Sequence, residues 1–524
     1  MTGKGHSASI PSVRLYRPDP SDKQPPPYVA LSHCWGPKET AKKRLLLTRD
    51  VMQNFDRNIE WDAMPETFQD GIMVAWRLGI RHVWIDSLCI IQQDKEDWTI
   101  EAPKMGDYYA NAYLTVSASS SACGDEKFLR PRPGIIAQAE EIKYYGPESV
   151  SMTAKIGRGL KMKRGTMTIP GPLSSRAWTL QERILSTRVV HFTDEGTVWE
   201  CQEDTRSEDH RVRESGPLRK WQELEAPSSM EGEKEARKMR NKIQASWRHL
   251  VAEYTQRQLT ERSDIMAAIS SIAARMHGFI GAPYLAGLWQ DRFVEDLCWR
   301  PEVSYGEKVP LLTPEDIELN MPTWSWMSIR HAVSHTVIGP SLGAFVSHCS
   351  LVEHGQVTRE SNQFMELASG RSVVVKGRIV EMEITFHGHL PSGDAKSAAV
   401  RLDTYYKSYN SGVLMDVPLV SVEAVSPASG KMIQTARRGR QGDRIKGFHG
   451  TIYCLELGRW MPAKTRFALG GVDHHFVMVL APSVTTPGAY ERLGMLDNTF
   501  GGGYKGSTRR QVWGDVTPTL VTLV

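Results

Sequence analysis

The feature that most constrains the fold is an alternation of short apolar runs with amphipathic stretches between residues 28 and 116. Tyr28-Val29-Ala30-Leu31-Ser32 leans toward β structure and stops at Trp35-Gly36-Pro37, so it predicts a buried strand. The runs 82–86 and 112–116 predict two further buried strands. This alternation favours an α/β fold with a doubly wound parallel sheet, whose ligand sites gather at the carboxyl ends of the strands.

Helices are predicted between these strands. The first has an apolar stripe and is expected to end at Gly79; the stripe consists of Phe68, Ile72, Ala75 and Trp76. A second helix-like stretch runs from Asp94 to Ala110. Residues 119–174 then interrupt the rhythm with glycine, proline and polar residues, and we interpret them as an insertion of loops or a hairpin.

A further helix is expected from Trp178 to Leu185, with Ser174 or Ser175 as its N-terminal cap. Farther along the chain, residues 208–258 are dense in mixed charge and carry apolar residues at helical spacing, namely Trp221, Leu224, Met239, Ile243 and Trp247. Beyond residue 341, β-branched and alternating segments predict strands.

The length of 524 residues predicts two or three domains, because single cores stop growing at roughly 250–300 residues. We predict a flexible N-terminal arm over residues 1–27 and an α/β domain over 28–207. A mainly helical connector over 208–340 and a β-rich accessory region over 341–524 are expected to follow.

Charge and cysteine content exclude several classes of partner. A formal charge of +4 gives no general attraction to nucleic acid, and no apolar run is long enough for a membrane span. The seven cysteines lack zinc-like spacing and fit a reducing compartment, so a cytoplasmic location is expected.

Two local motifs have an ordinary interpretation. The cluster of Arg437, Arg438, Arg440 and Arg444 is interpreted as a solvated loop rather than a phosphate-binding patch. The segment Gly501-Gly502-Gly503, followed by Lys505, does not have P-loop spacing, so a flexible turn is expected there.

Three segments together carry a family resemblance. They are Tyr28-Val29-Ala30-Leu31-Ser32-His33-Cys34-Trp35-Gly36, Trp84-Ile85-Asp86-Ser87-Leu88-Cys89-Ile90-Ile91-Gln92 and Arg176-Ala177-Trp178-Thr179-Leu180-Gln181-Glu182-Arg183. These segments resemble the signature blocks of the fungal heterokaryon-incompatibility (HET) domain. Weaker similarity in 65–70, 104–112 and 198–201 extends the resemblance over roughly residues 28–201.

The resemblance implies a fungal protein of innate immunity that triggers programmed cell death when genetically unlike cells fuse. It also implies self-association through the HET domain and activation by an unknown protein partner. HET domains resemble TIR domains, many of which hydrolyse NAD. The implied fold is therefore TIR-like, and the implied activity is that of an NAD glycohydrolase that takes NAD as substrate and uses no metal or cofactor.

Under this resemblance Glu182 is the catalytic carboxylate, and Ser32, His33, Asp86 and Trp178 bind the substrate. Residues four apart share a helix face, so Trp178 and Glu182 would present a ring and a carboxylate to one pocket. A carboxylate can stabilise the positive charge that develops on ribose during glycosidic cleavage.

Each of these residues also has a structural interpretation. Trp178 can be core, Glu182 can pair with Arg183 or Arg176, and Asp86 can cap the following turn. Neighbouring strand residues point to opposite faces, which argues against activation of Cys34 by His33. A second hypothesis is therefore a non-enzymatic signalling module that recruits a death-inducing partner. Convergence of Ser32, Asp86 and Glu182 at one concave site would favour the enzyme, and their dispersal would favour the module.

Overall fold

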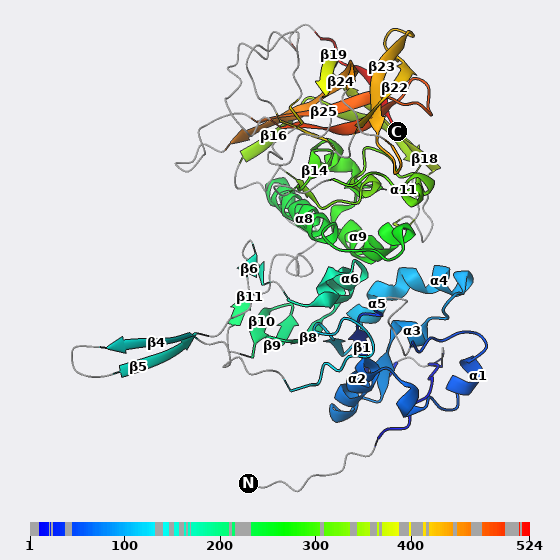
Figure 1. Ribbon diagram of the computed structural model, residues 1–524, viewed down its shortest axis with the longest axis vertical. Coiled ribbons are helices and arrows are strands. Elements are labelled where there is room, and N and C mark those ends of the chain that lie inside the picture. Colours follow the sequence, from blue (N-terminus) through cyan, green and yellow to red (C-terminus); the bar gives the residue numbers. More distant parts are fainter. Residues whose placement is uncertain are drawn as a thin grey trace. The chain divides into compact units, whose positions relative to one another are not determined.

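The computed structural model divides the chain into two compact units, Met1–Leu224 and Glu225–Val524 (Figure 1). The structure describes residues 10–19, 21, 25–36, 44–131, 140–145, 151–156, 162–163, 166–167, 169–208, 212–214, 232–303, 309–335, 343–356, 364–365, 369–386, 398–399, 412–415, 419–443, 448–462, 474–497, 513 and 516–524. Much of the predicted N-terminal arm, Trp221, Leu224, Arg444 and the 501–505 segment lie outside these residues. The predicted domain boundaries at 207 and 340 are finer than the two-unit division and stay predictions.

The N-terminal unit is built on a seven-stranded mixed sheet in the order β11-β10-β9-β8-β3-β1-β2. Its strands are β1 (Tyr28–Ser32), β2 (His82–Trp84), β3 (Leu114–Ser117), β8 (Arg188–Thr193), β9 (Gly196–Cys201), β10 (Asp204–Ser207) and β11 (Val212–Glu214). Strands β2, β1, β3 and β8 are parallel to one another, whereas β9 pairs antiparallel with β8, and β10 and β11 continue the sheet with antiparallel pairing. The α/β class is confirmed, but the wholly parallel sheet is wrong, because the two-residue connections around β9 permit only antiparallel pairing.

Helices pack on both faces of the parallel strands. Val29 and Leu31 of β1 share a core cluster with the apolar side of α2 (Glu66–Arg77). Ala30 points to the opposite face, as alternation along a strand requires, and shares a second cluster with α5 (Met105–Ala110). Trp178 of α6 (Trp178–Leu185) packs against that second cluster.

Two predicted helices need correction. The stripe of α2 is confirmed for Phe68, Ile72 and Ala75, but Trp76 is 43% exposed. At 3.6 residues per turn Trp76 lies about 80° around the helix from Phe68, at the margin of the buried face.

The stretch from Asp94 to Ala110 is likewise not one α-helix. It consists of α4 (Lys95–Glu101), a 3₁₀ turn η2 (Ala102–Lys104) and α5, and Asp94 caps α4 by accepting hydrogen bonds from the Glu96 and Asp97 amides. The interruption falls at Pro103, which has no backbone N–H to donate. The shorter elements nearby are α1 (Met52–Phe55), η1 (Trp61–Ala63) and α3 (Asp86–Cys89).

The segment before α6 contains two short hairpins and a 3₁₀ turn. Strand β4 (Glu140–Tyr145) pairs with β5 (Ser151–Ile156), and β6 (Met162–Lys163) pairs with β7 (Thr166–Met167). The expected serine cap is wrong, because Ala177 is the cap position of α6 and makes no side-chain hydrogen bond. Ser174 and Ser175 end η4 (Pro172–Ser175), and their hydroxyls donate to the carbonyls of Gly171 and Pro172.

Helices of the C-terminal unit surround a core rich in tryptophan. The elements are α8 (Glu233–Tyr254), η7 (Arg262–Ile265), α9 (Ala267–Ile280), β12 (Tyr284–Leu285), β13 (Leu288–Trp289), η8 (Gln290–Arg292), α10 (Phe293–Asp296), β14 (Trp299–Pro301), α11 (Pro314–Leu319), η9 (Trp326–Ser328) and β15 (Val333–His335). Trp247, Trp289, Trp299 and Trp326 are fully buried. The indole N–H groups of Trp247 and Trp326 both donate to the Gly287 carbonyl, at 3.0 and 3.1 Å.

The predicted β-rich C-terminal region is confirmed. A ten-stranded sheet contains β16 (Gly343–Ser347), β17 (Ser350–Gln356), β18 (Ser369–Gly377), β19 (Ile379–Phe386), β20 (Ala398–Ala399), β21 (Gly412–Met415), β24 (Phe448–Pro462), β25 (His474–Pro482), β26 (Tyr490–Asp497) and β27 (Thr519–Leu523). A separate hairpin consists of β22 (Leu419–Val425) and β23 (Met432–Arg438).

The solvated-loop interpretation of the arginine cluster is wrong for Arg438. Its side chain is 4% exposed, and its guanidinium donates to Ser328 Oγ and to the carbonyls of Thr323 and Arg492. Arg437 and Arg438 are the last residues of β23, whose alternation turns Arg438 inward. Among the residues described, no helix is long and apolar enough to cross a membrane.

Candidate functional site

The carboxyl ends of β1 and β2 meet the helix α6 at a buried carboxylate. Ser32 is the last residue of β1, Asp86 follows β2 directly as the first residue of α3, and Glu182 lies on α6. The Ser32 hydroxyl donates to Glu182 Oε2 at 2.5 Å, and both residues are almost fully buried. Two positions that are 150 residues apart in the chain are therefore in direct contact.

Burial dominates the charge state of Glu182. It raises the pKa of this carboxyl to about 7, and the negative charge of Asp86 adds to the effect. Hydrogen bonds from Ser32 and Tyr109 and the positive charge of Arg176 oppose the shift. The carboxyl therefore changes charge close to neutral pH, unlike an ordinary surface glutamate.

Asp86 is more exposed than Glu182, and two groups donate hydrogen bonds to its carboxylate. The Trp35 indole donates to both of its oxygens, at 3.0 and 3.3 Å, and the Ser87 amide donates to Oδ1 at 2.7 Å. His33 Nδ1 lies 3.8 Å from Oδ1. The Ser87 contact joins adjacent residues and is not a helix cap, because Ile85 holds the cap position of α3 and α3 has no side-chain cap hydrogen bond; the Asp86 side chain is 21% exposed.

His33 and Cys34 do not form a nucleophilic pair. Burial lowers the pKa of His33, while burial raises the pKa of the Cys34 thiol to about 11. The His33 ring packs edge-on against Phe68, with ring centroids 4.9 Å apart. The backbone carbonyl of His33 accepts a hydrogen bond from the Arg176 guanidinium at 3.0 Å. A neutral histidine and a protonated thiol argue against hydrolase chemistry at these positions.

Trp178 is half-buried and packs on the cluster that contains Ala30 and Tyr109. Tyr109 thus contacts the same core cluster as Trp178 and also donates to Glu182. The structure brings Ser32, His33, Asp86 and Glu182 together, and Trp178 lies one helical turn before Glu182. Presentation of the Trp178 ring to a substrate stays a prediction.

Two residues of this site were not predicted as site residues. Tyr109 and Trp35 lie in segments that carry the family resemblance, but helical or strand periodicity does not mark them. Only the fold brings them to Glu182 and Asp86. Arg176 was considered as a structural partner of Glu182, and its positive charge does act on that carboxyl. The alternative pairing of Glu182 with Arg183 is wrong, because Arg183 donates to both oxygens of Glu200, at 2.8 and 3.0 Å.

A second buried polar network lies beside the first. His191 on β8 contacts Ser117 Oγ through Nδ1 at 3.1 Å and Glu200 Oε2 through Nε2 at 3.0 Å. Arg183 completes the network through Glu200, and all four side chains are buried or nearly so. Because each group is satisfied internally, this network anchors α6 to β8 and β9.

The chemistry available at the candidate site is electrostatic. Two carboxylates, Glu182 and Asp86, lie in a poorly solvated region and can stabilise positive charge that develops on a bound molecule. Within the described part of the chain, no group of three or more His, Cys, Asp or Glu side chains is placed to hold a metal ion.

Comparison with known proteins gives one family match. No curated protein and no solved structure matches the chain. The matching family model is described as Heterokaryon incompatibility protein (HET), and the match covers residues 28–182, from the first residue of β1 to the candidate carboxylate itself. Residues 28–182 therefore match the HET domain, which implies a function related to heterokaryon incompatibility.

Proposed function

We propose that this chain is a cell-death effector of heterokaryon incompatibility whose N-terminal unit cleaves NAD at the bond between nicotinamide and ribose. The observation that carries the proposal is the Ser32–Glu182 hydrogen bond, which holds a buried carboxylate beside Asp86 at the carboxyl ends of two parallel strands. Ligand sites of open α/β sheets lie at such ends.

The sheet supports a TIR-like, doubly wound fold as part of the proposal. The parallel strands follow the order β2-β1-β3-β8, so β1 is an internal strand. The chain adds β2 on one side of β1 and then crosses to add β3 and β8 on the other side. Helices pack against both faces of β1. Strand order 2-1-3-4 with helices on two faces is characteristic of doubly wound sheets.

The proposed reaction breaks the C1′–N glycosidic bond, and its electron pair neutralises the nicotinamide ring. Positive charge then develops on the ribose, where ionised Glu182 stabilises it. Water adds to C1′ and releases one proton, which yields nicotinamide and ADP-ribose. Ser32 and Tyr109 hold the Glu182 carboxylate in place through their hydroxyls.

Other residues would bind rather than react. The exposed part of Asp86 is placed to accept a hydrogen bond from a ribose hydroxyl, and His33 lies beside it. The half-buried Trp178 ring would stack on a base or on nicotinamide. We also propose that the HET domain extends over 28–207, self-associates, and acts in the cytoplasm after activation by a protein partner.

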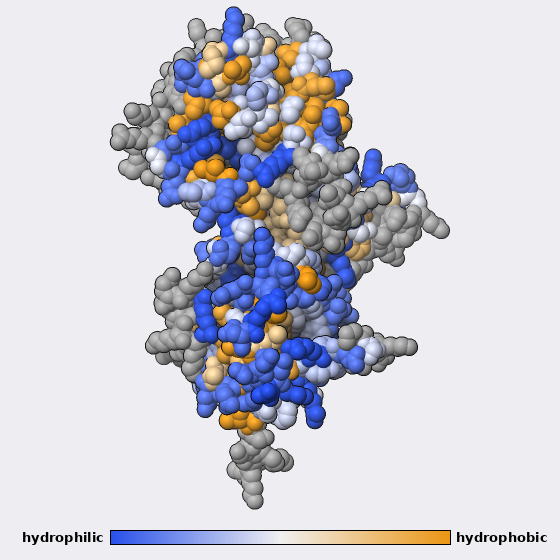
Figure 2. Space-filling model, turned by 90° about the vertical axis from the view of Figure 1, so that its right-hand side faces the viewer, coloured by the Kyte–Doolittle hydropathy of each residue, from blue (hydrophilic) through white to orange (hydrophobic). Residues whose placement is uncertain are grey.

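A non-enzymatic signalling module is the second candidate, and a specific observation favours it. Glu182 and Ser32 satisfy each other and are 5% and 4% exposed, as expected of a structural pair. Exposed apolar side chains on α2 and α4, among them Trp76, Trp98 and Ile100, would then contact a partner. In Figure 2 the visible face of the N-terminal unit is mostly hydrophilic, which gives such contacts a small area on that face.

The decisive experiment incubates the purified full-length chain with NAD and measures nicotinamide and ADP-ribose by chromatography. We expect Glu182→Gln to reduce product formation by at least about 10²-fold, because it removes the charge and leaves the shape. Glu203→Gln, which changes an exposed glutamate of the same unit, serves as the matched control and should retain activity.

The same variants expressed in cells separate the two candidates. The enzyme requires that loss of NAD and loss of viability both disappear with Glu182→Gln and persist with Glu203→Gln. Cell death that survives Glu182→Gln at equal protein level, with NAD unchanged, would reject the enzyme and support the module.

A further inference from the structure

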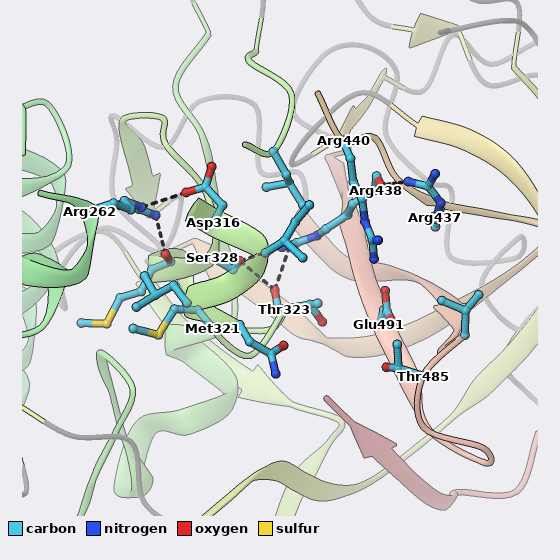
Figure 3. A pocket seen from close by; sticks show the side chains of 16 residues that line it. Arg262, Asp316, Met321, Thr323, Ser328, Arg437, Arg438, Arg440, Thr485 and Glu491 are labelled. Carbon is cyan, nitrogen blue, oxygen red and sulfur yellow. Dashed lines mark hydrogen bonds and ion pairs between the residues drawn. The ribbon is translucent and has the colours of Figure 1, made fainter. Parts of the chain in front are cut away.

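A pocket in the C-terminal unit is unusually rich in arginine. Its volume is about 110 Å³, well above the roughly 10–15 Å³ that one water molecule requires on this measure. The walls come from four separate stretches of chain: η7, the segment 312–328, the end of β23 with Arg440 after it, and the turn between β25 and β26 with the start of β26 (Figure 3). We call this site the arginine pocket.

The charge of the lining is predominantly positive. Four arginines line the pocket, namely Arg262, Arg437, Arg438 and Arg440, and only two carboxylates, Asp316 and Glu491, oppose them. Hydroxyls of Thr323, Ser328 and Thr485 add polar groups, while Leu312, Ile317 and Val484 are among the apolar side chains of the walls. Such a mixture suits a molecule with one anionic group and a small organic remainder.

Two of the four arginines are tied to the protein. Arg262 donates to Asp316 Oδ1 at 3.0 Å and to the carbonyls of Met327 and Ile329. The Arg438 guanidinium is held by hydroxyl and carbonyl oxygens, including Ser328 Oγ at 2.7 Å. The protein's own acceptors therefore hold these two lining side chains in place, and Asp316 is also held by Arg330.

The other two arginines are more exposed. Arg437 is half-buried, and its guanidinium donates to the Arg438 carbonyl and forms a two-point ion pair with Asp443, at 2.9 and 3.0 Å. Arg440 is exposed, and its guanidinium has no hydrogen-bond partner among the described residues. Its backbone amide and carbonyl both bond to Asp443. A planar guanidinium presents a fork of donors that matches a phosphate oxygen pair.

We propose that the arginine pocket binds the phosphate group of a small soluble molecule, with Arg440 and Arg437 as its charged donors. Phosphate fits better than a carboxylate for two reasons. The arginine and hydroxyl donors of the lining come from several stretches of chain, and the four arginines outnumber the two carboxylates by two formal charges. Since the walls belong to the helical segment 312–328 and to the β22–β23 hairpin, bound phosphate ties these two parts of the unit together.

The test measures binding to the full-length chain by isothermal titration calorimetry at one fixed ionic strength. The probes are glycerol 3-phosphate, inorganic phosphate and acetate, so that a phosphate ester, the free ion and a carboxylate are compared. We expect saturable binding of one phosphate probe per chain, with acetate weaker by about tenfold or more.

Two substitutions with opposite expected effects on affinity distinguish binding at the arginine pocket from non-specific attraction between the anion and the positively charged surface. Arg440→Gln should weaken the phosphate probe about tenfold, and Asp443→Asn should tighten it, because it frees Arg437 and removes a negative charge. Lys431→Gln removes an equal charge from the turn of the same hairpin and should change nothing.

The melting temperature of each variant, measured without ligand, checks that the pocket is folded. Equal affinity for acetate, no saturable binding, or an Arg440→Gln variant that binds like Lys431→Gln would each overturn the proposal.

Discussion

At the scale of single residues, the carboxyl of Glu182 couples pH to stability. Its pKa rises from 4.5 to about 7 on folding. Between these values the unfolded state loses the proton while the folded state keeps it, so stability should fall as pH rises from about 4.5 to 7, by about 3 kcal/mol, and level off above. Glu182→Gln should flatten this slope in urea unfolding measured from pH 4.5 to 8.5. An unchanged slope would show that Glu182 does not titrate in this range.

Asp86 is expected to set where that titration occurs. Because its charge raises the pKa of Glu182, Asp86→Asn should move the fall in stability toward lower pH. If Glu182 is catalytic, the midpoint of the rise in kcat/KM with pH should move the same way. Asp194→Asn, at an exposed aspartate, is the control. A midpoint that stays fixed in Asp86→Asn would remove Asp86 from the electrostatics of the site.

Single residues were only partly predictable from the sequence. The family resemblance marked Ser32, Asp86 and Glu182 as candidate site residues, and strand ends marked the first two, but their convergence was left as a test between the two hypotheses. The structure brings Ser32 and Glu182 into contact. Tyr109 was missed, since an apolar ring on a helix indicates core and nothing local shows its hydroxyl reaching a carboxylate. Arg438 was misjudged because a run of arginines resembles a surface loop until the pairing of β22 with β23 turns one side chain inward.

At the scale of elements, the turn between β12 and β13 supports the tryptophan core. Gly287 has φ +92°, and a Cβ there would lie 2.5 Å from Trp326 Nε1. Gly287→Ala should therefore destabilise the C-terminal unit by about 2–3 kcal/mol in denaturant unfolding, combining strain and a clash. Gly430→Ala, at φ +67° with nothing within 4 Å, isolates the strain and should cost about 1 kcal/mol. Equal losses would exclude the clash with Trp326.

The buried network that anchors α6 should be costly to break. Glu200→Gln removes the charge that pairs with Arg183 and weakens the acceptor for His191. We expect a loss of about 3 kcal/mol in the stability of the N-terminal unit, because a buried ion pair is broken. Chemical unfolding of Glu200→Gln and Glu203→Gln provides the comparison. A loss below about 1 kcal/mol would mean that water replaces Glu200.

Elements were more predictable than their pairing. Residues of β1, β2 and β3 were recognised from apolar runs, and α2 from its stripe. Sequence periodicity carries no information on strand direction, so the antiparallel addition of β9 and β10 was not foreseen. The cap of α6 was misplaced because the 3₁₀ turn η4 uses the serine hydroxyls for its own carbonyls.

At the scale of the whole molecule, two compact units should give two unfolding transitions. In differential scanning calorimetry, Gly287→Ala should lower one transition and Glu200→Gln the other, since each change lies inside one unit. A shift of both transitions by either variant would show that the units unfold as one.

The contact between Ser32 and Glu182 also bears on when the activity can arise during synthesis. The two residues are 150 positions apart in the chain, and β3, which pairs with β1, is synthesised between them. A ribosome that has released only the first three strands has made no α6, so a nascent chain of that length lacks the carboxylate altogether. On the proposed function, a cell that makes this protein is therefore spared its toxicity until the helix has emerged and docked, and chains that terminate before α6 lack the carboxylate.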